Sequence, residues 1–151
     1  MQNQNGFTLI EMVVVIVVLG ILAAIAVPKF IDLQADARLS TVNGVAGAIQ
    51  GASALGHAQA LVDGTVNGNV NMEGTVVVVN GYPAATVTGI GAALNLDGFT
   101  VTYAVGPPAT ATFVPDSGGA AGCQVVYTGA AAGPPIVAPI INNTATLANC
   151  Q

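Results

Sequence analysis

The feature that most constrains this chain is a long apolar stretch near its N-terminus. Residues 7–27 are almost entirely apolar, and Glu11 carries the only formal charge among them. As a helix that rises about 1.5 Å per residue, the stretch is about 31 Å long, enough to cross the hydrocarbon core of a bilayer. The sequence therefore predicts a helix that is surrounded by lipid or by other apolar helices.

The composition agrees with a chain that is partly embedded in lipid or in other copies of itself. Of its 151 residues, 53% are hydrophobic and only 6% are charged, whereas a soluble domain carries about a quarter charged residues. Seven acidic and two basic residues give a net charge of −5. Nucleic-acid binding requires a cluster of Lys and Arg, so we expect no nucleic-acid partner.

The apolar stretch differs from a cleaved secretory signal. Such a signal has a positive first segment, a shorter apolar core and a small-residue cleavage site after that core. Here the one candidate cleavage site, Gly6, precedes the apolar stretch. Cleavage there would remove residues 1–6 as a leader peptide and leave the hydrophobic helix on the mature chain.

Two motifs carry a resemblance to a known family. The motif GFTLIE (6–11) and the apolar run after it resemble the N-terminus of type IV prepilins and pseudopilins, and AVPKFIDLQADAR (26–38) resembles the mannose-sensitive haemagglutinin branch of pilins. The resemblance implies that a prepilin peptidase cleaves between Gly6 and Phe7 and methylates the new Phe7 amine. Leaders of this family usually carry Lys or Arg, which residues 1–5 lack.

Glu11 is the unusual residue of the apolar stretch. It lies about 6 Å along the helix from Phe7, so it can reach the membrane interface by snorkelling. Among packed helices it needs a partner, because an unpaired buried charge is strongly destabilising. The nearby cation is the amine freed at Phe7, on this subunit or on a neighbour. The resemblance implies the neighbour's amine, which would set the register of assembly. The alternative is a tolerated interfacial charge without a partner.

Gly20 and Pro28 bracket a weak part of the predicted helix. Pro28 has no N–H to donate to the carbonyl of Ala24, and a helical Gly is about 1 kcal/mol less favourable than Ala. The resemblance implies that this segment melts in the filament. A simple kink at Pro28 is the alternative.

Two stripes at helical spacing follow, and they predict an amphipathic helix over residues 29–62. The apolar stripe, which should face a core, comprises Leu39, Val42, Val45, Ile49, Ala52 and Leu55. The small-residue stripe lies on another face and comprises Ser40, Gly44, Gly47, Gly51 and Ala54. Because small residues permit close approach, the second stripe indicates either contact with neighbouring subunits or packing against the chain's own sheet.

The remaining residues, 63–151, predict a β-rich head. Residues 62–74 indicate a polar loop and 89–96 a short helix, whereas alternation and β-branched content predict strands. The predicted strands cover residues 75–79, 99–105, 110–114, 123–129 and 135–141. The expected fold class is α+β: a long N-terminal helix, with hydrophobic half 7–28 and amphipathic half 29–62, on an antiparallel sheet of about four strands. This is the ladle architecture that the resemblance implies.

The cysteine pair, Cys123 and Cys150, bears on the same head. In an exported protein an even pair predicts a disulfide, and their spacing fits no zinc site that the single His57 could complete. We therefore expect a Cys123–Cys150 bridge that holds residues 147–151 near the sheet. Two unrelated buried thiols are the alternative.

The sequence offers no constellation for catalysis and none for a cofactor. His57 is expected to be solvated or capped. Asp97 and Asp116 are the candidates for a calcium site of the kind found in major pseudopilins, although no oxygen-rich loop surrounds them.

The predicted function is structural. The chain is expected to be the major subunit of a type IV pilus for adhesion or motility, and its partners are identical subunits, the prepilin peptidase and the assembly machinery. It would lie in the inner membrane before assembly and at the cell surface afterwards. The alternative is the major pseudopilin of a type II secretion system.

Overall fold

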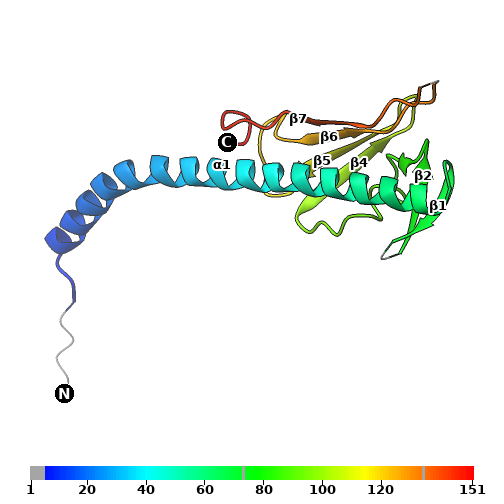
Figure 1. The fold of residues 1–151 in the computed structure, drawn as a ribbon. Helices are drawn as coiled ribbons and strands as arrows, with labels where there is room; N and C mark the ends of the chain where they lie inside the picture. The colour runs from blue at the N-terminus through cyan, green and yellow to red at the C-terminus, as the bar shows by residue number, and fades with distance from the viewer. Residues whose placement is uncertain (1–5, 73, 134) are drawn as a thin grey trace, which may run out of the picture. The chain divides into compact units, whose positions relative to one another are not determined.

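The computed structural model describes residues 6–72, 74–133 and 135–151, and the chain forms two compact units, Met1–Gln34 and Ala35–Gln151. Helix α1 (Leu9–Val62) contributes residues to both units (Figure 1). The strands that follow in the described residues are β1 (Gly68–Asn71), β2 (Thr75–Val79), β3 (Tyr82–Pro83), β4 (Phe99–Ala104), β5 (Thr110–Pro115), β6 (Val125–Thr128) and β7 (Ile140–Asn143).

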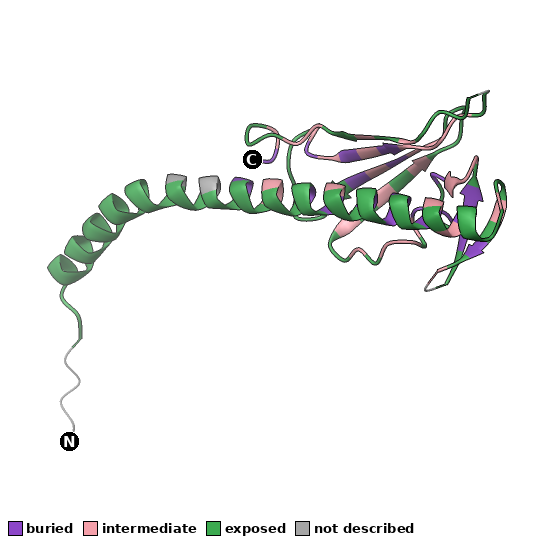
Figure 2. Cartoon of the chain, viewed as in Figure 1, coloured by how far each residue is buried: buried purple, intermediate pink, exposed green. Residues whose placement is uncertain are grey.

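In the first unit, α1 is an apolar helix without a core of its own. The segment Leu9–Val27 is long and apolar enough to cross a membrane, and none of it is buried (Figure 2). The helix begins at Leu9, so the expected start at Phe7 is wrong by two residues. Its backbone continues through Pro28, while melting in the filament and a kink at that proline both stay predictions.

In the second unit, α1 buries one face against the sheets. Val42, Val45, Ile49 and Ala52 belong to one buried cluster, as the apolar stripe predicts. The prediction is wrong for Leu55, which is 64% exposed. The buried face continues instead through residues 56 and 60, because the next helical turn approaches β3 too closely for a large side chain.

The sheet predicted from the sequence is present as β4–β7. These four strands are antiparallel and adjacent in the order β4-β5-β6-β7 (Figure 1). Phe113 of β5 and Tyr127 of β6 point to the helix and lie in the same buried cluster as Ile49. The Tyr127 hydroxyl donates to the carbonyl of Pro83 at 2.7 Å, and burial raises the pKa of this phenol to about 12. The hydroxyl therefore stays a donor at neutral pH and links the two sheets.

A second antiparallel sheet, in the order β1-β2-β3, corrects the predicted polar loop over residues 62–74. Strand β1 lies inside that loop because Val70 pairs with Val76 and both side chains are buried. The connection from β2 to β3 is a tight Asn80-Gly81 turn in which both residues have positive φ, 54° and 75°. This is the geometry that an Asn-Gly hairpin turn adopts.

Two further segments differ from expectation. Residues 89–93 form turns and 94–96 are irregular, so the expected helix over 89–96 is wrong. Ile90 is buried in the core, and its N–H donates back to the carbonyl of Ala84. Of the predicted strand 135–141, only its end enters β7. Its earlier part makes an isolated bridge between Ala131 and Val137.

The small-residue stripe faces away from the sheets. All five of its members are exposed, and no atom lies within 4 Å of a Cβ built at any of its three glycines. The possibility that this stripe packs against the chain's own sheet is therefore wrong.

Two helical glycines give a matched test of this packing. A Cβ at Gly56 would collide with the ring of Pro83, whereas one at Gly51 meets open space. We expect Gly56→Ala to destabilise the subunit by about 1–3 kcal/mol through overpacking. Gly51→Ala should instead stabilise it by about 0.5–1 kcal/mol, since Ala favours the helix. Denaturant unfolding of the detergent-solubilised subunits measures both, and equal effects would contradict the described contact with β3.

Candidate functional site

The N-terminus of α1 is closed by a reciprocal capping arrangement between Thr8 and Glu11. The backbone N–H of Thr8 donates to Oε2 of Glu11 at 2.8 Å, and the Thr8 hydroxyl donates to the same oxygen at 2.7 Å. The Glu11 N–H donates in return to the Thr8 hydroxyl at 3.3 Å. This capping box satisfies backbone donors that a helix start leaves without partners.

The cap determines where the helix begins and what lies before it. Because Thr8 is the capping residue, Gly6, Phe7 and Thr8 lie outside the helix and are exposed. The Gly6–Phe7 bond is therefore in non-helical chain, two residues before Leu9. Within the described chain, both bonds that the Glu11 carboxylate accepts go to Oε2, which leaves Oε1 available to a donor from outside.

The intrachain role of Glu11 was missing from the sequence interpretation. That interpretation considered the freed Phe7 amine, on this subunit or on a neighbour, or no partner at all, and it left Thr8 out. The signal was present, because Thr-x-x-Glu directly before an apolar run is the pattern of a capping box. Thr8 is thus an additional residue of this site.

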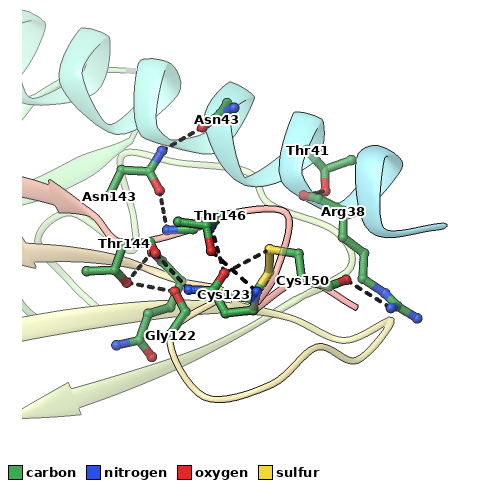
Figure 3. Close-up of a disulfide and its surroundings, with 12 residues drawn as sticks. Arg38, Thr41, Asn43, Gly122, Cys123, Asn143, Thr144, Thr146 and Cys150 are labelled. Atoms are coloured by element: carbon green, nitrogen blue, oxygen red, sulfur yellow. Dashed lines mark hydrogen bonds between the residues drawn. A yellow bond between two sulfur atoms is a disulfide. The ribbon is translucent and has the colours of Figure 1, made fainter. Parts of the chain in front are cut away.

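The cysteines form the second predicted site, and the structure contains the predicted bridge. Cys123 and Cys150 are joined by a disulfide with a Cα–Cα distance of 5.0 Å, and both residues are buried (Figure 3). The alternative of two unrelated thiols is therefore wrong. The bridge connects the loop before β6 to the last turn of the described chain.

Polar contacts support the disulfide from both sides (Figure 3). Arg38 of α1 donates from Nη1 to the carbonyl of Cys150 at 3.1 Å. The Ala120 N–H donates to the carbonyl of Asn149 at 2.7 Å, and the Thr144 hydroxyl donates to the carbonyl of Gly122 at 2.7 Å. The C-terminal segment therefore packs on the loop before β6 and on the helix, and the role of Arg38 was not foreseen from the sequence.

His57 has a packing role. Its Nδ1 lies 2.7 Å from the carbonyl of Gly81, and its ring stacks on Tyr82 with centroids 4.0 Å apart. The ring thus holds the β2–β3 turn against α1. We expected a solvated or capped side chain, and the structure shows a half-buried side chain that is hydrogen-bonded and stacked.

The calcium candidates do not gather into a cluster. Asp116 accepts a hydrogen bond from the Thr100 hydroxyl at 2.6 Å, and Asp97 is exposed. Across residues 6–72, 74–133 and 135–151, no group of three or more His, Cys, Asp or Glu residues could hold a metal ion.

Comparison with known proteins connects the first site to a family. Residues 1–27 match the family described as the prokaryotic N-terminal methylation motif. The type IV narrow pilus major component PilA5 of Thermus thermophilus is 51% identical over 56 residues, which cover 37% of this chain and 48% of that protein. The type IV major pilin protein PilA of Myxococcus xanthus is 57% identical over 38 residues, which cover 25% of this chain and 17% of that protein. No solved structure gives a significant match.

One relative extends well beyond the N-terminal helix. The fimbrial protein EcpC of Eikenella corrodens is 38% identical over 115 residues, which cover 66% of this chain and 73% of EcpC. The chain thus spans about half the length of PilA5 but nearly three quarters of EcpC. The methylation motif, the capped apolar helix and this long match together show that the chain belongs to the type IV pilin family.

Proposed function

We propose that this chain is the major structural subunit of a type IV pilus and that it polymerises through its N-terminal hydrophobic helix. The observation that carries the proposal is the exposure of this helix. Every large apolar side chain from Leu9 to Val27 is at least 40% exposed in the isolated subunit. Such a surface is unstable in water and requires lipid or other apolar helices around it.

Glu11 is proposed to select the neighbour in the filament. When apolar helices pack together, its carboxylate loses water and needs a cation. The sequence has two basic residues, Lys29 and Arg38, and Arg38 already bonds to Cys150. The methylated amine of Phe7 on an incoming subunit would supply a cation at the matching depth. The free Oε1 of Glu11 is the atom that would accept from it.

The proposal includes a sequence of locations and partners. The precursor would sit in the inner membrane, where the prepilin peptidase cuts between Gly6 and Phe7. The assembly machinery would then move the subunit into an extracellular filament of identical copies, used for adhesion or motility. Nothing in this role requires catalysis by the subunit itself, so we propose that the chain is not an enzyme.

The direct test is to shear surface fibres from the source cells and to identify their main protein. We expect this chain to dominate the sheared fraction. Its absence from such fibres, together with its retention in the inner membrane, would contradict the proposal and favour the major pseudopilin of a type II secretion system.

Cleavage and methylation of the subunit give a second test, which requires only the mass of the mature protein. We expect the mature subunit to begin at Phe7 with a methylated amine, because the apolar helix must be retained and Glu11 needs a cation. Intact-mass spectrometry of native filaments would show the loss of residues 1–6 and the gain of one methyl group. A mass that still includes residues 1–6 would contradict the proposed cleavage.

A further inference from the structure

A pocket in the second unit lies between its two sheets and has no part in the function proposed above. Its volume is about 540 Å³, which is within the range of about 300–1,000 Å³ for sites that hold small molecules. Both sheets contribute to its walls. The lining comprises residues 79–80 and 84–86 beside β2 and β3, residues 106–109 between β4 and β5, and residues 129–132 after β6.

The pocket begins where β5 and β6 stop pairing. In the described structure, the last backbone bond between these two chains runs from the Gly129 N–H to the carbonyl of Ala109 at 2.9 Å. On one wall, residues 106–108 include two prolines, which have no N–H to donate. On the other wall, Ala131 pairs with Val137 and not with that segment. The two walls therefore separate, and a wedge-shaped space opens between them.

The β2–β3 hairpin closes this space from the side of the smaller sheet. Asn80 Nδ2 donates to the carbonyl of Ala130 at 3.1 Å, which holds the hairpin against the wall after β6. Ala84 and Ala85 beside it are buried, and a Cβ built at Gly129 would lie 3.5 Å from the Cβ of Ala85. Hydrogen bonds and close packing thus hold the three walls together, so the pocket is preformed in the folded head.

The lining is apolar and uncharged. Of its thirteen residues, eleven are Gly, Ala, Pro or Val, and the other two are Asn80 and Thr86. Both polar side chains are already bonded within the chain, because Asn80 donates to Ala130 and the Thr86 hydroxyl accepts from the Gly89 N–H at 3.0 Å. A charged ligand would have no counterion in this lining, and the hydroxyls of a sugar would lose water without gaining enough partners. The lining therefore selects an uncharged ligand with few polar groups.

The kinds of side chain narrow the ligand class further. None of the thirteen lining residues is aromatic, so a flat aromatic ligand gains no ring stacking. Methyl groups and proline rings make dispersion contacts with an aliphatic chain instead. The apolar surface also continues beside the pocket, where Val105 is completely exposed and Val137 is 52% exposed. A chain longer than the pocket thus stays in contact with apolar atoms.

We propose that this pocket binds an uncharged aliphatic chain. The inference goes beyond the proposed function, because the site belongs to the second unit alone and does not require polymerisation. A filament would repeat the site on every subunit. Affinity should rise about fourfold with each CH₂ group added to the ligand, as expected when apolar surface leaves water, until the chain fills the pocket.

Photo-cross-linking on sheared full-length filaments, prepared without detergent, tests the proposal. The probe is an unbranched primary alcohol that bears a diazirine, and peptide mass spectrometry locates the cross-links. We expect them in residues 106–109 and 129–132. Unlabelled straight-chain alcohols should suppress the labelling about fourfold more effectively per added CH₂ group. Cross-links confined to Leu9–Val27, or suppression that does not depend on chain length, would overturn the proposal.

Matched substitutions test the walls of the pocket. Ala109→Leu and Ala131→Leu fill it from opposite walls, and each should lower the labelling about tenfold or more, because a leucine occupies the space of several CH₂ groups of the ligand. Ala104→Leu adds the same side chain at an exposed position of β4 outside the lining. This control should be labelled as the wild type is. Equal labelling of all three variants would overturn the site.

Filament yield separates this proposal from the pilus function. Where a wall variant forms no filaments, the position of the wild-type cross-links decides the question. A sheared fraction without wild-type filaments would contradict the pilus function. The same probe, applied to cell membranes that contain the subunit, should then still label residues 106–109 and 129–132, and absence of that labelling would overturn the aliphatic site.

Discussion

Glu11→Gln should leave the subunit inserted and cleaved while filament assembly falls on the order of tenfold or more, as expected when one partner of a buried ion pair is neutralised. Gln has nearly the same size as Glu and can still accept from the Thr8 N–H, so the capping box is preserved. The charge that would attract the Phe7 amine of a neighbour is lost. The measurement is the ratio of sheared filament to membrane-bound subunit for variant and wild type.

Glu11→Val separates the two roles of this carboxylate. Valine removes the capping bonds as well as the charge, and it makes the segment a better membrane span. If charge pairing is the essential role, both variants insert normally and assemble poorly to a similar extent. If the cap matters more, Gln assembles well and Val does not, which would contradict the pairing model.

The same pair of variants distinguishes assembly from processing. Cleaved, membrane-bound subunit that fails to enter filaments is the expected state of both. Loss of cleavage in both would show that the peptidase recognises Glu11. Filament yields equal to the wild type would show that the carboxylate does not set the register.

The disulfide should have the second largest effect, and it acts on the second unit. Cys123 and Cys150 are 27 residues apart, and closing such a loop is worth about 3.5 kcal/mol in the chain-entropy model. We expect Cys123→Ser to lower the free energy of unfolding by about this amount. Surface filaments should decrease while membrane insertion stays intact, because the first unit contains neither cysteine.

Two controls make this result specific. The double variant Cys123→Ser/Cys150→Ser removes the bridge without leaving a free thiol. Its free energy of unfolding should be about the same as that of Cys123→Ser. Peptide mass maps of the mature protein, with and without reductant, should differ by the bridged pair. Identical maps would mean that the native protein lacks the bridge.

Predictions from the sequence were correct where a pattern of residues is compatible with a single structural element. The apolar run of residues 7–27 predicted the exposed helix, and the stripe through Val42, Val45 and Ile49 predicted its buried continuation. Alternation of β-branched residues located β4, β5 and β6. The cysteine pair predicted the bridge, which the structure contains.

Predictions from the sequence were wrong where close packing determines which of two adjacent residues is buried. Leu55 and Gly56 both continue the apolar stripe at allowed spacing, and only the approach of Pro83 shows that the glycine faces inward. Strand β1 was not predicted because Val70 is its single buried residue, and its other residues are Gly and Asn. The roles of Arg38 and His57 depend on carbonyl groups distant in sequence, at Cys150 and Gly81, which no local pattern indicates.

The position of the disulfide has a mechanical consequence for a subunit under load. Tension applied to the chain beyond Cys150 passes through the sulfur bridge to Cys123 and does not run along the residues between them. Strands β6 and β7 lie inside that covalent loop, so pulling on the chain end cannot peel them from the sheet one after the other. The residues between the cysteines, which would extend to about 90 Å at about 3.4 Å per residue, therefore cannot be stretched out. The bridge thus limits how far the head can lengthen before the helix contacts bear the force.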